Sequence, residues 1–129
     1  MNKEHPNIEV LKRLDLTNMV ASAEVLAKDF IWHYFNLELP EINGDYHGIN
    51  GFADFFTKMA RNTGDTFKVN VISTTPMGDE LVVTHVKDIM TLKGKSMEID
   101  AVVVWSIAAG KIQEAWDIPA IHSVKVIES

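Results

Sequence analysis

The hydrophobic pattern of this chain changes its period at Gly64, and that change restricts the fold more than any other feature. Before Gly64, apolar residues recur at spacings of three and four, which is typical of amphipathic helices. After Gly64, apolar and polar residues alternate and Val, Ile, Thr and Trp are frequent, as in strands with one buried face. Helices followed by strands predict an α+β domain, with the helices packed on one face of a curved sheet.

Two short helices are predicted near the N-terminus. Pro6 suits the first turn of one helix, because the N–H that proline lacks would have no partner there in any helix. The apolar face of this helix would consist of Ile8, Leu11 and Leu14. Thr17 or Asn18 can cap a second helix, which would end near Asp29. The apolar stripe of the second helix would consist of Val20, Ala23, Leu26 and Ala27.

The third predicted helix is the strongest and runs from Ile49 to about Arg61. Its apolar side recurs at helical spacing, with Ile49, Phe52, Ala53, Phe56, Met59 and Ala60. Residues 62–64 supply a stop, since glycine is favoured just after the end of a helix. Upstream of this helix, Phe30–Tyr34 is predicted to be a strand that joins the edge of the sheet.

Four successive strands are predicted after Gly64. They cover Thr66–Thr75, Glu80–Leu92, Lys95–Ile107 and Lys111–Ile118. Short connections at residues 76–79, 93–94 and 108–110 each contain a glycine, and connections this short join antiparallel neighbours. The second half of the chain therefore predicts an antiparallel meander.

Strand pairing predicts which side chains share a face of this sheet. A three-residue connection with Gly110 in the left-handed conformation would set Ile107 opposite Lys111. The inner face would then carry Val82, Thr84, Val86, Met90, Ala101, Val103, Trp105, Gln113, Ala115 and Asp117. The outer face would carry His85, Val102, Val104, Trp116 and Ile118. This mixed apolar outer face suits contact with a second copy of the chain.

Composition excludes several classes of function. The 129 residues suit a single domain that spans all of them. A formal charge of −6, with Lys and Arg scattered singly, leaves no basic face for nucleic acid or an anionic membrane. No cysteine is present and no two histidines have helical metal-ligand spacing, so we expect neither metal nor cofactor. No apolar run is long enough to cross a bilayer, so a cytoplasmic location is expected.

Asp117 is the best chemical clue in the sequence. It lies deep in the last predicted strand, among tryptophans and aliphatic residues. A carboxylate in such surroundings is costly to ionise unless it is solvated, paired or used in chemistry. Two interpretations follow: Asp117 faces a pocket, where it binds or reacts with a ligand, or it is solvated or paired with a lysine. Asp88 and Asp100 are interpreted as solvated strand acids, and His33 and His85 as surface or interface residues.

Several short motifs occur in a characteristic order along the chain. They are His5-Pro6-Asn7, Ile31-Trp32-His33, Gly44-Asp45-Tyr46-His47-Gly48-Ile49, Gly110-Lys111-Ile112 and Trp116-Asp117. Together they resemble the SnoaL-like branch of the nuclear-transport-factor-2-like superfamily over nearly the whole chain. The resemblance implies a cone-shaped, curved antiparallel sheet wrapped around the N-terminal helices, with an apolar pocket between them and often a homodimer. It implies no single function, because the superfamily includes isomerases, polyketide cyclases, dehydratases, epoxide hydrolases and non-catalytic binding modules.

The resemblance also supplies a set of candidate pocket residues. They are Trp32, Tyr34, Tyr46, Phe56, Thr84, Val86, Val103, Trp105, Ala115 and Asp117. In the cyclases of this superfamily an acid on this strand can be catalytic. Ketosteroid isomerases resemble the fold but use two aspartates and a tyrosine, whose matching neighbourhoods here hold Tyr34 or Leu39, Val103 and Asp15. These departures argue against ketosteroid isomerisation.

Two hypotheses of different classes follow. The first is a cofactor-free isomerase, cyclase or dehydratase that acts on a small, largely apolar carbonyl compound. In it Asp117 would exchange a proton with the substrate, and Tyr34 or Thr84 would hydrogen-bond the developing enolate oxygen. The second is a non-catalytic module that holds an apolar metabolite or serves homodimerisation. A second polar group that converges on Asp117 would favour the enzyme.

Overall fold

The computed structural model describes residues 5–121 and 124–127. Helices and strands occur along the chain in the order α1 (Pro6–Lys12), α2 (Met19–Ser22), β1 (Leu26–Tyr34), β2 (Gly44–His47), α3 (Gly48–Thr63), β3 (Lys68–Met77), β4 (Leu81–Leu92), β5 (Lys95–Ala108), β6 (Lys111–Pro119) and β7 (Lys125–Val126). The predicted α+β class is confirmed. The helices come early, and the long strands follow Gly64 as the change of period indicates.

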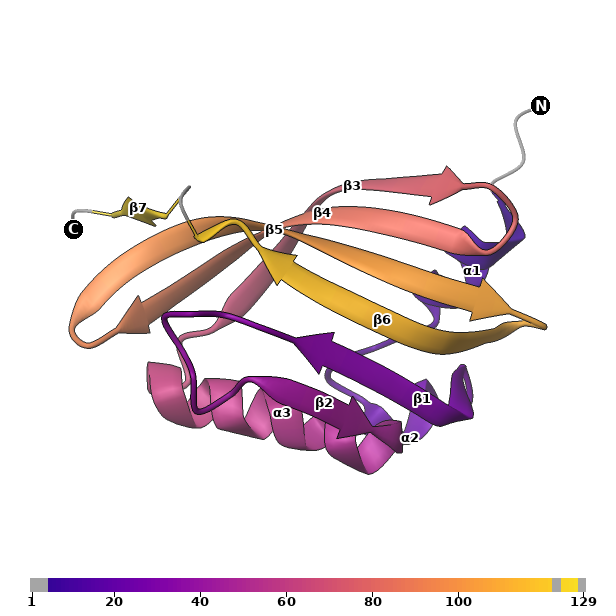
Figure 1. Cartoon of the computed structure of the whole chain (residues 1–129), viewed down its shortest axis with the longest axis horizontal. Helices are drawn as coiled ribbons and strands as arrows, with labels where there is room; N and C mark the ends of the chain where they lie inside the picture. The colour runs from indigo at the N-terminus through magenta and orange to yellow at the C-terminus, as the bar shows by residue number, and fades with distance from the viewer. Residues whose placement is uncertain (1–4, 122–123, 128–129) are drawn as a thin grey trace.

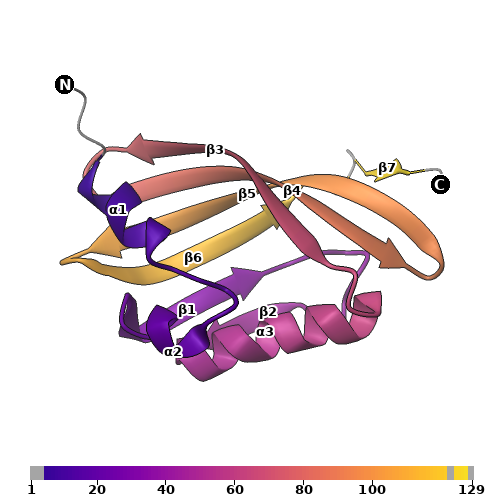
Figure 2. The same ribbon diagram turned by 180° about the vertical axis from the view of Figure 1, so that it is seen from behind.

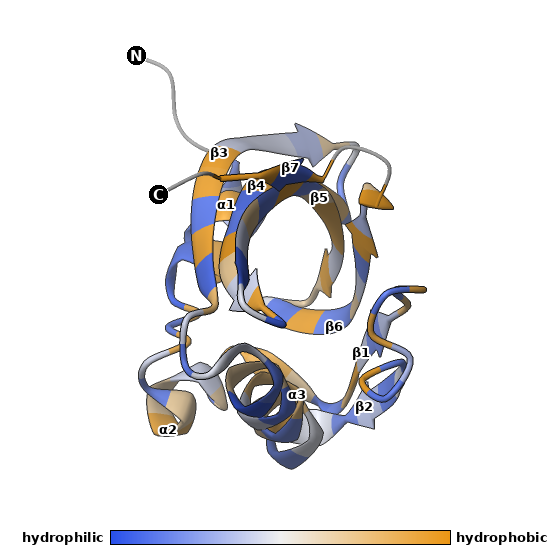
Figure 3. Cartoon of the chain, turned by 90° about the vertical axis from the view of Figure 1, so that its left-hand side faces the viewer, coloured by the Kyte–Doolittle hydropathy of each residue, from blue (hydrophilic) through white to orange (hydrophobic). Residues whose placement is uncertain are grey.

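The strands form one curved sheet in the order β2-β1-β6-β5-β4-β3, with the short β7 paired to β5. Strands β3 to β6 form the predicted antiparallel meander. Helix α3 runs beneath β1 and β2, and α1 covers the other end of the sheet (Figures 1 and 2). Viewed along its length, the sheet curls around its inner face without closing, and α3 lies below the open side (Figure 3). No helix in the described part of the chain is long and apolar enough to cross a membrane.

The second predicted helix is wrong over most of its length. Asn18 does cap it, accepting a hydrogen bond from Ala21 N, but α2 ends after one turn at Ser22. Leu26, which was expected on the helical stripe, instead begins β1, and Ala27 and Asp29 also lie in that strand. Pairing with β2 and β6 satisfies the backbone of β1 on both sides, and this tertiary pairing outweighs a weak local preference for helix.

Strand β1 is longer than predicted, and it joins the meander at the edge strand β6 as the sequence indicated, although β2 then pairs on its other side. It lies between β2 and β6, and it pairs with β6 in parallel. The register sets Trp32 beside Ala115 and Tyr34 beside Asp117. The otherwise antiparallel sheet is therefore mixed, and β1 becomes a wall of the molecule's interior, with Phe30, Trp32 and Tyr34 all buried.

Helix α3 confirms the strongest prediction. It ends where expected, with Gly64 in the left-handed conformation at φ 59°. Phe52 and Met59 are buried as the stripe predicted, and Phe55, which was not assigned to it, is buried as well. The helix packs tightly on β2 at Gly51, where a Cβ atom would lie only 2.9 Å from the carbonyl carbon of Tyr46.

The connection between β5 and β6 differs from the predicted three-residue turn. It has two residues, Ala109 and Gly110, both with positive φ, and it pairs Ala108 with Lys111. The register then shifts by one residue next to Ser106, which restores the expected faces. Val103 therefore lies opposite Asp117, and both side chains are buried on the inner face.

Candidate functional site

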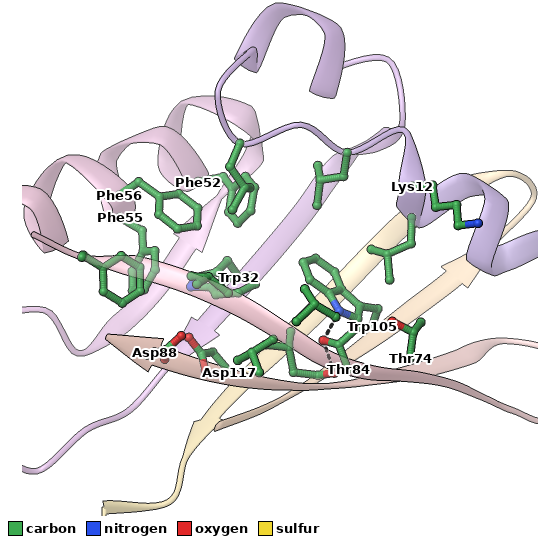
Figure 4. A pocket seen from close by; sticks show the side chains of 18 of the residues that line it. Lys12, Trp32, Phe52, Phe55, Phe56, Thr74, Thr84, Asp88, Trp105 and Asp117 are labelled. Atoms are coloured by element: carbon green, nitrogen blue, oxygen red, sulfur yellow. Dashed lines mark hydrogen bonds between the residues drawn. The ribbon is translucent and has the colours of Figure 1, made fainter. Parts of the chain in front are cut away.

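An apolar cavity of about 340 Å³ lies between the inner face of the sheet and the helices. Most of its walls are aliphatic or aromatic, and side chains from α1, α3 and five of the long strands contribute to them (Figure 4). The aromatic part consists of Trp32, Phe52, Phe55, Phe56, Phe67 and Trp105. A cavity of this size and composition is typical of sites for small organic molecules.

Asp117 lies at this cavity with only 9% of its surface exposed. Its Oδ1 atom is buried and has no hydrogen-bond partner among the described residues. Burial raises the pKa of Asp117 well above its usual value, and the nearby negative charge of Asp88 raises it further. The carboxyl group is therefore neutral at pH values where an ordinary aspartate is ionised.

Asp88 on β4 is the second acid of the cavity, and the interpretation of Asp88 as a solvated acid is wrong. The residue is 6% exposed, and burial raises its pKa to about 7. Figure 4 draws its carboxyl group beside that of Asp117. The signal was present in the sequence, because the alternation that turns Val86 and Met90 inward turns Asp88 inward too.

Trp32 contributes an unpaired hydrogen-bond donor. Its indole Nε1 is buried and has no partner within the part of the chain that the structure describes. The ring is fixed by aromatic neighbours, with centroid distances of 5.0 Å to Phe52, 5.3 Å to Phe55 and 5.6 Å to Trp105. The sequence indicated Trp32 as a wall residue, but it carried no sign that the indole N–H would lack a partner.

Thr84 has its hydroxyl group engaged within the protein. Trp105 Nε1 donates a hydrogen bond to the Thr84 hydroxyl oxygen at 3.1 Å. The hydroxyl in turn donates to the backbone oxygen of Val103 at 3.5 Å. This network satisfies Trp105 and directs the Thr84 proton to the sheet rather than to the cavity.

The structure brings most of the predicted pocket residues to the cavity. Those that line it are Trp32, Phe56, Thr84, Val86, Val103, Trp105 and Asp117. Tyr34, Tyr46 and Ala115 are buried but are not among the lining residues. Asn36 Nδ2 donates to the Tyr34 hydroxyl at 3.0 Å, and Tyr46 donates its hydroxyl proton to the backbone oxygen of Ile42. Burial, more than any other effect, raises the pKa of Tyr34.

Two histidines lie away from the cavity, on the outer face of the sheet. His33 lies between Asp45, at 2.6 Å, and Glu114, and its ring stacks on Trp116. Burial lowers the pKa of His33, but the hydrogen bonds with Glu114 and Asp45 raise it more. His85 contacts Asp100 at 2.8 Å, and this hydrogen bond lowers the pKa of Asp100. No cluster suited to a metal ion occurs in residues 5–121 and 124–127.

A family model described as the SnoaL-like domain matches residues 8–115, most of the chain. The chain belongs to this family. The fold of the SnoaL-like chain, with its curved sheet, helices and inner cavity, agrees with this assignment. Among curated proteins, no sequence matches it significantly.

Solved structures with the SnoaL-like chain's fold include three with informative names. Bal32a from a soil-derived mobile gene cassette is 19% identical with a TM-score of 0.80, and the match covers 95% of both chains. TerC co-crystallized with polyporic acid is 19% identical with a TM-score of 0.76, covering 91% of this chain and 93% of TerC. The Δ5-3-ketosteroid isomerase from Mycobacterium sp. is 14% identical with a TM-score of 0.67, covering 96% and 100%. At these identities the likeness is one of fold alone.

Proposed function

We propose that this SnoaL-like chain is a cofactor-free acid–base enzyme that moves a proton on a small, mostly apolar carbonyl compound. The reaction would be an isomerisation, cyclisation or dehydration. The observation that carries the proposal is Asp117, a carboxyl group buried in an aromatic cavity with one oxygen unpartnered among the described residues. Burial of a carboxyl group disfavours its ionised form, and groups perturbed in this way are typical of catalytic sites.

Asp88 supplies the second polar group that favours the enzyme over a simple binding module. Two neighbouring carboxyl groups in an apolar site do not both ionise near neutral pH, because desolvation and mutual repulsion oppose the second charge. Asp88, with its pKa of about 7, is partly ionised near neutral pH and can serve as the base, and Asp117, whose pKa burial raises well above its usual value, can supply a proton as the acid. Pairs of acids whose surroundings separate their pKa values divide the two roles of proton transfer in this way.

The proton balance of one turnover follows from these assignments. The Asp88 carboxylate takes a proton from the carbon next to the substrate carbonyl, and the electron pair moves onto the carbonyl oxygen as an enolate. Asp117 gives its proton to a second position of the enolate in an isomerisation, or to the hydroxyl that departs in a dehydration. In a cyclisation the enolate carbon bonds to a second carbonyl carbon of the substrate, and Asp117 protonates the alkoxide that forms. Asp88 is then protonated and Asp117 ionised. A proton that passes between the neighbouring carboxyl groups restores the starting state.

The cavity and the fold relatives support a small apolar substrate. The wall is largely apolar, and its volume of about 340 Å³ suits a molecule of one to a few rings. One fold relative, TerC, was co-crystallized with polyporic acid, and another is a ketosteroid isomerase. The alternative function is a non-catalytic binding module, and a designed 17-OHP binder has the same fold.

A proton-exchange assay tests the proposal without knowledge of the full reaction. Small aromatic ketones such as 2-tetralone, 1-indanone and 2-acetylnaphthalene are incubated with the protein in D2O, and deuterium at the carbon next to the carbonyl is measured by NMR. The parent protein should catalyse exchange in at least one of them. Asp88→Asn, which removes the base that takes this proton, should lower the rate by about 100-fold or more. Asp100→Asn, which changes an acid on the outer face, is the matched control and should exchange at the parent rate. Equal rates in Asp88→Asn and the parent would refute the proposal.

A further inference from the structure

We infer that the indole N–H of Trp32 is a ligand-binding group, which donates a hydrogen bond to the oxygen of a neutral, otherwise apolar carbonyl compound in the cavity. The inference rests on the proposed function, because it concerns the same cavity, and it adds the donor and the ligand class. It stands on the placement of Trp32, on its missing partner and on the charges around it.

The unpaired state of Trp32 is specific to this residue. Both Trp32 and Trp105 line the cavity, and both are buried, at 3% and 7% exposure. The indole N–H of Trp105 donates a hydrogen bond to the Thr84 hydroxyl, whereas the indole N–H of Trp32 has no acceptor among the described residues. A buried N–H that forgoes water without gaining a partner destabilises the protein, and native structures rarely leave one. A ligand oxygen would complete the hydrogen bond that the fold leaves open.

The position of Trp32 brings its N–H to the acidic end of the cavity. Trp32 lies beside Ala115 in the parallel β1–β6 pair, and Asp117 is two residues further along β6, on the same face. Figure 4 draws the indole above the two carboxyl groups, with its nitrogen at the end of the ring that lies over them. An oxygen bound to Trp32 would therefore place its carbonyl carbon and neighbouring carbon near Asp88 and Asp117.

The other donors considered from the sequence are less well placed. The Thr84 hydroxyl gives its proton to Val103 and accepts one from Trp105. The Tyr34 hydroxyl accepts from Asn36, and the residue does not line the cavity. Apart from the carboxyl groups of Asp88 and Asp117, whose protons the proposed reaction uses, Trp32 is the buried donor left for the ligand among the described residues that line the cavity. It thereby takes the role that the sequence suggested for Tyr34 or Thr84.

The surroundings of Trp32 restrict the ligand to a neutral acceptor. A carboxylate would meet the charge of Asp88 in a wall of low polarity, which disfavours it. An ammonium group has no lone pair for the indole N–H. A hydrocarbon would fill the aromatic cavity but would leave the N–H unpaired. A ketone or aldehyde carries no charge, its oxygen has a lone pair for the indole N–H, and its carbon skeleton can fill the aromatic cavity.

Four ligands with one naphthalene body test this assignment. They are 2-acetylnaphthalene, its hydrocarbon analogue 2-isopropenylnaphthalene, 2-naphthoate and 1-(2-naphthyl)ethylamine. The indole N–H resonances of the 15N-labelled protein report on each tryptophan, and Trp105→Phe and Trp116→Phe assign them. The ketone should move the Trp32 resonance downfield, and the hydrocarbon should not. Trp116, on the outer face, is the internal control and should stay in place for both.

Affinities measured by calorimetry give a second readout. The ratio of ketone affinity to hydrocarbon affinity should fall by about fivefold in Trp32→Phe, as expected for one net hydrogen bond. The NMR measurement on the parent protein keeps the inference falsifiable if Trp32→Phe folds poorly. A bound ketone that leaves the Trp32 resonance unmoved would overturn the inference, and so would tighter binding of the amine than of the ketone.

The outcome separates this inference from the proposed function. Deuterium exchange that depends on Asp88, with an unmoved Trp32 resonance, would overturn the role of Trp32 and leave the enzyme standing. A moved Trp32 resonance without any exchange would support the ligand class and refute the enzyme.

Discussion

Asp88 on β4 and Asp117 on β6 lie with their carboxyl groups side by side in the cavity, although strand β5 separates their backbones (Figure 4). In the register of the sheet, Asp117 shares a row with Val103 and Thr84, and Asp88 is four residues further along β4. A flat sheet would hold the two acids far apart. The curvature of the sheet brings them together, and it thereby couples their ionisation.

Asp88 should make the stability of the protein depend on pH. Its folded pKa of about 7 exceeds the unfolded value of about 3.9, so the native state binds the proton more tightly. The favourable contribution is fully present below pH 4, fades as the pH rises from about 4 to 7, and is absent above 7. Asp88→Asn should therefore unfold less readily than the parent at pH 8, by up to about 4 kcal/mol. Urea unfolding at pH 5, 6, 7 and 8 measures this difference. A constant difference across the series would contradict the assignment.

Asp117→Asn should fold and should be at least as stable as the parent at pH 7. Its folded pKa is also raised, so above the unfolded value of about 3.9 the native state holds a proton that the unfolded chain releases, and this lowers the free energy of unfolding as the pH rises. An amide keeps the shape and removes the ionisable group. Thermal unfolding over a pH series is the measurement, with Asp100→Asn as the outer-face comparison. A mutant much less stable than the parent at pH 7 would mean that the carboxylate is a structural partner, and the catalytic role would lose its main support.

Gly51→Ala should destabilise the protein by about 1–3 kcal/mol. In an ordinary helix interior this substitution is stabilising, because alanine loses less backbone entropy than glycine. At Gly51 the added Cβ would lie 2.9 Å from the carbonyl carbon of Tyr46, so α3 must move away from β2. The sign of the change in the free energy of unfolding is the result to look for. Stabilisation would show that α3 and β2 can separate at no cost.

The outer face of the sheet should form a symmetric homodimer. Val102 and Ile118, which pair with each other across β5 and β6, are 36% and 55% exposed, and Val104 and Trp116 form the next pair along on the same face. Such an apolar face suits an isologous contact. Sedimentation equilibrium at micromolar concentration should give twice the chain mass of 14.5 kDa. Ile118→Lys should shift the protein to the monomer. A parent protein that sediments only as the monomer would reject the dimer.

Long periodic segments were predictable from the sequence, and short or irregular ones were not. Helix α3 and strands β3 to β6 each carry many repeats of one period, so a few exceptions do not hide the pattern. The segment from Met19 to Tyr34 mixes helical and strand spacings, and pairing of β1 with β6, far away in sequence, decides its structure. No local pattern indicates a parallel partner that lies 83 residues further along the chain, as Ala115 does from Trp32.

The candidate site was partly predictable. Asp117 stood out because it lies deep in its strand among tryptophans and aliphatic residues, and the face assignment placed it correctly even though the turn at Gly110 was wrong. Asp88 was missed because its charge was given more weight than the alternation of β4, which turns it inward. The unpaired N–H of Trp32 could not be predicted, since it depends on how rings from α3 and β5 pack around the indole.

The cavity raises the pKa values of both Asp88 and Asp117, which is the central claim, and the carboxyl carbons of the two residues report it directly. Protein labelled with 13C at the aspartate carboxyl groups is titrated by NMR from pH 3 to 9, and Asp88→Asn and Asp117→Asn assign the two signals. Asp117 should titrate well above the usual range of an aspartate, and Asp88 should titrate with a midpoint of about 7. Asp100, whose pKa is lowered by its hydrogen bond with His85, is the internal reference. Midpoints near 4 for both Asp88 and Asp117 would contradict the account.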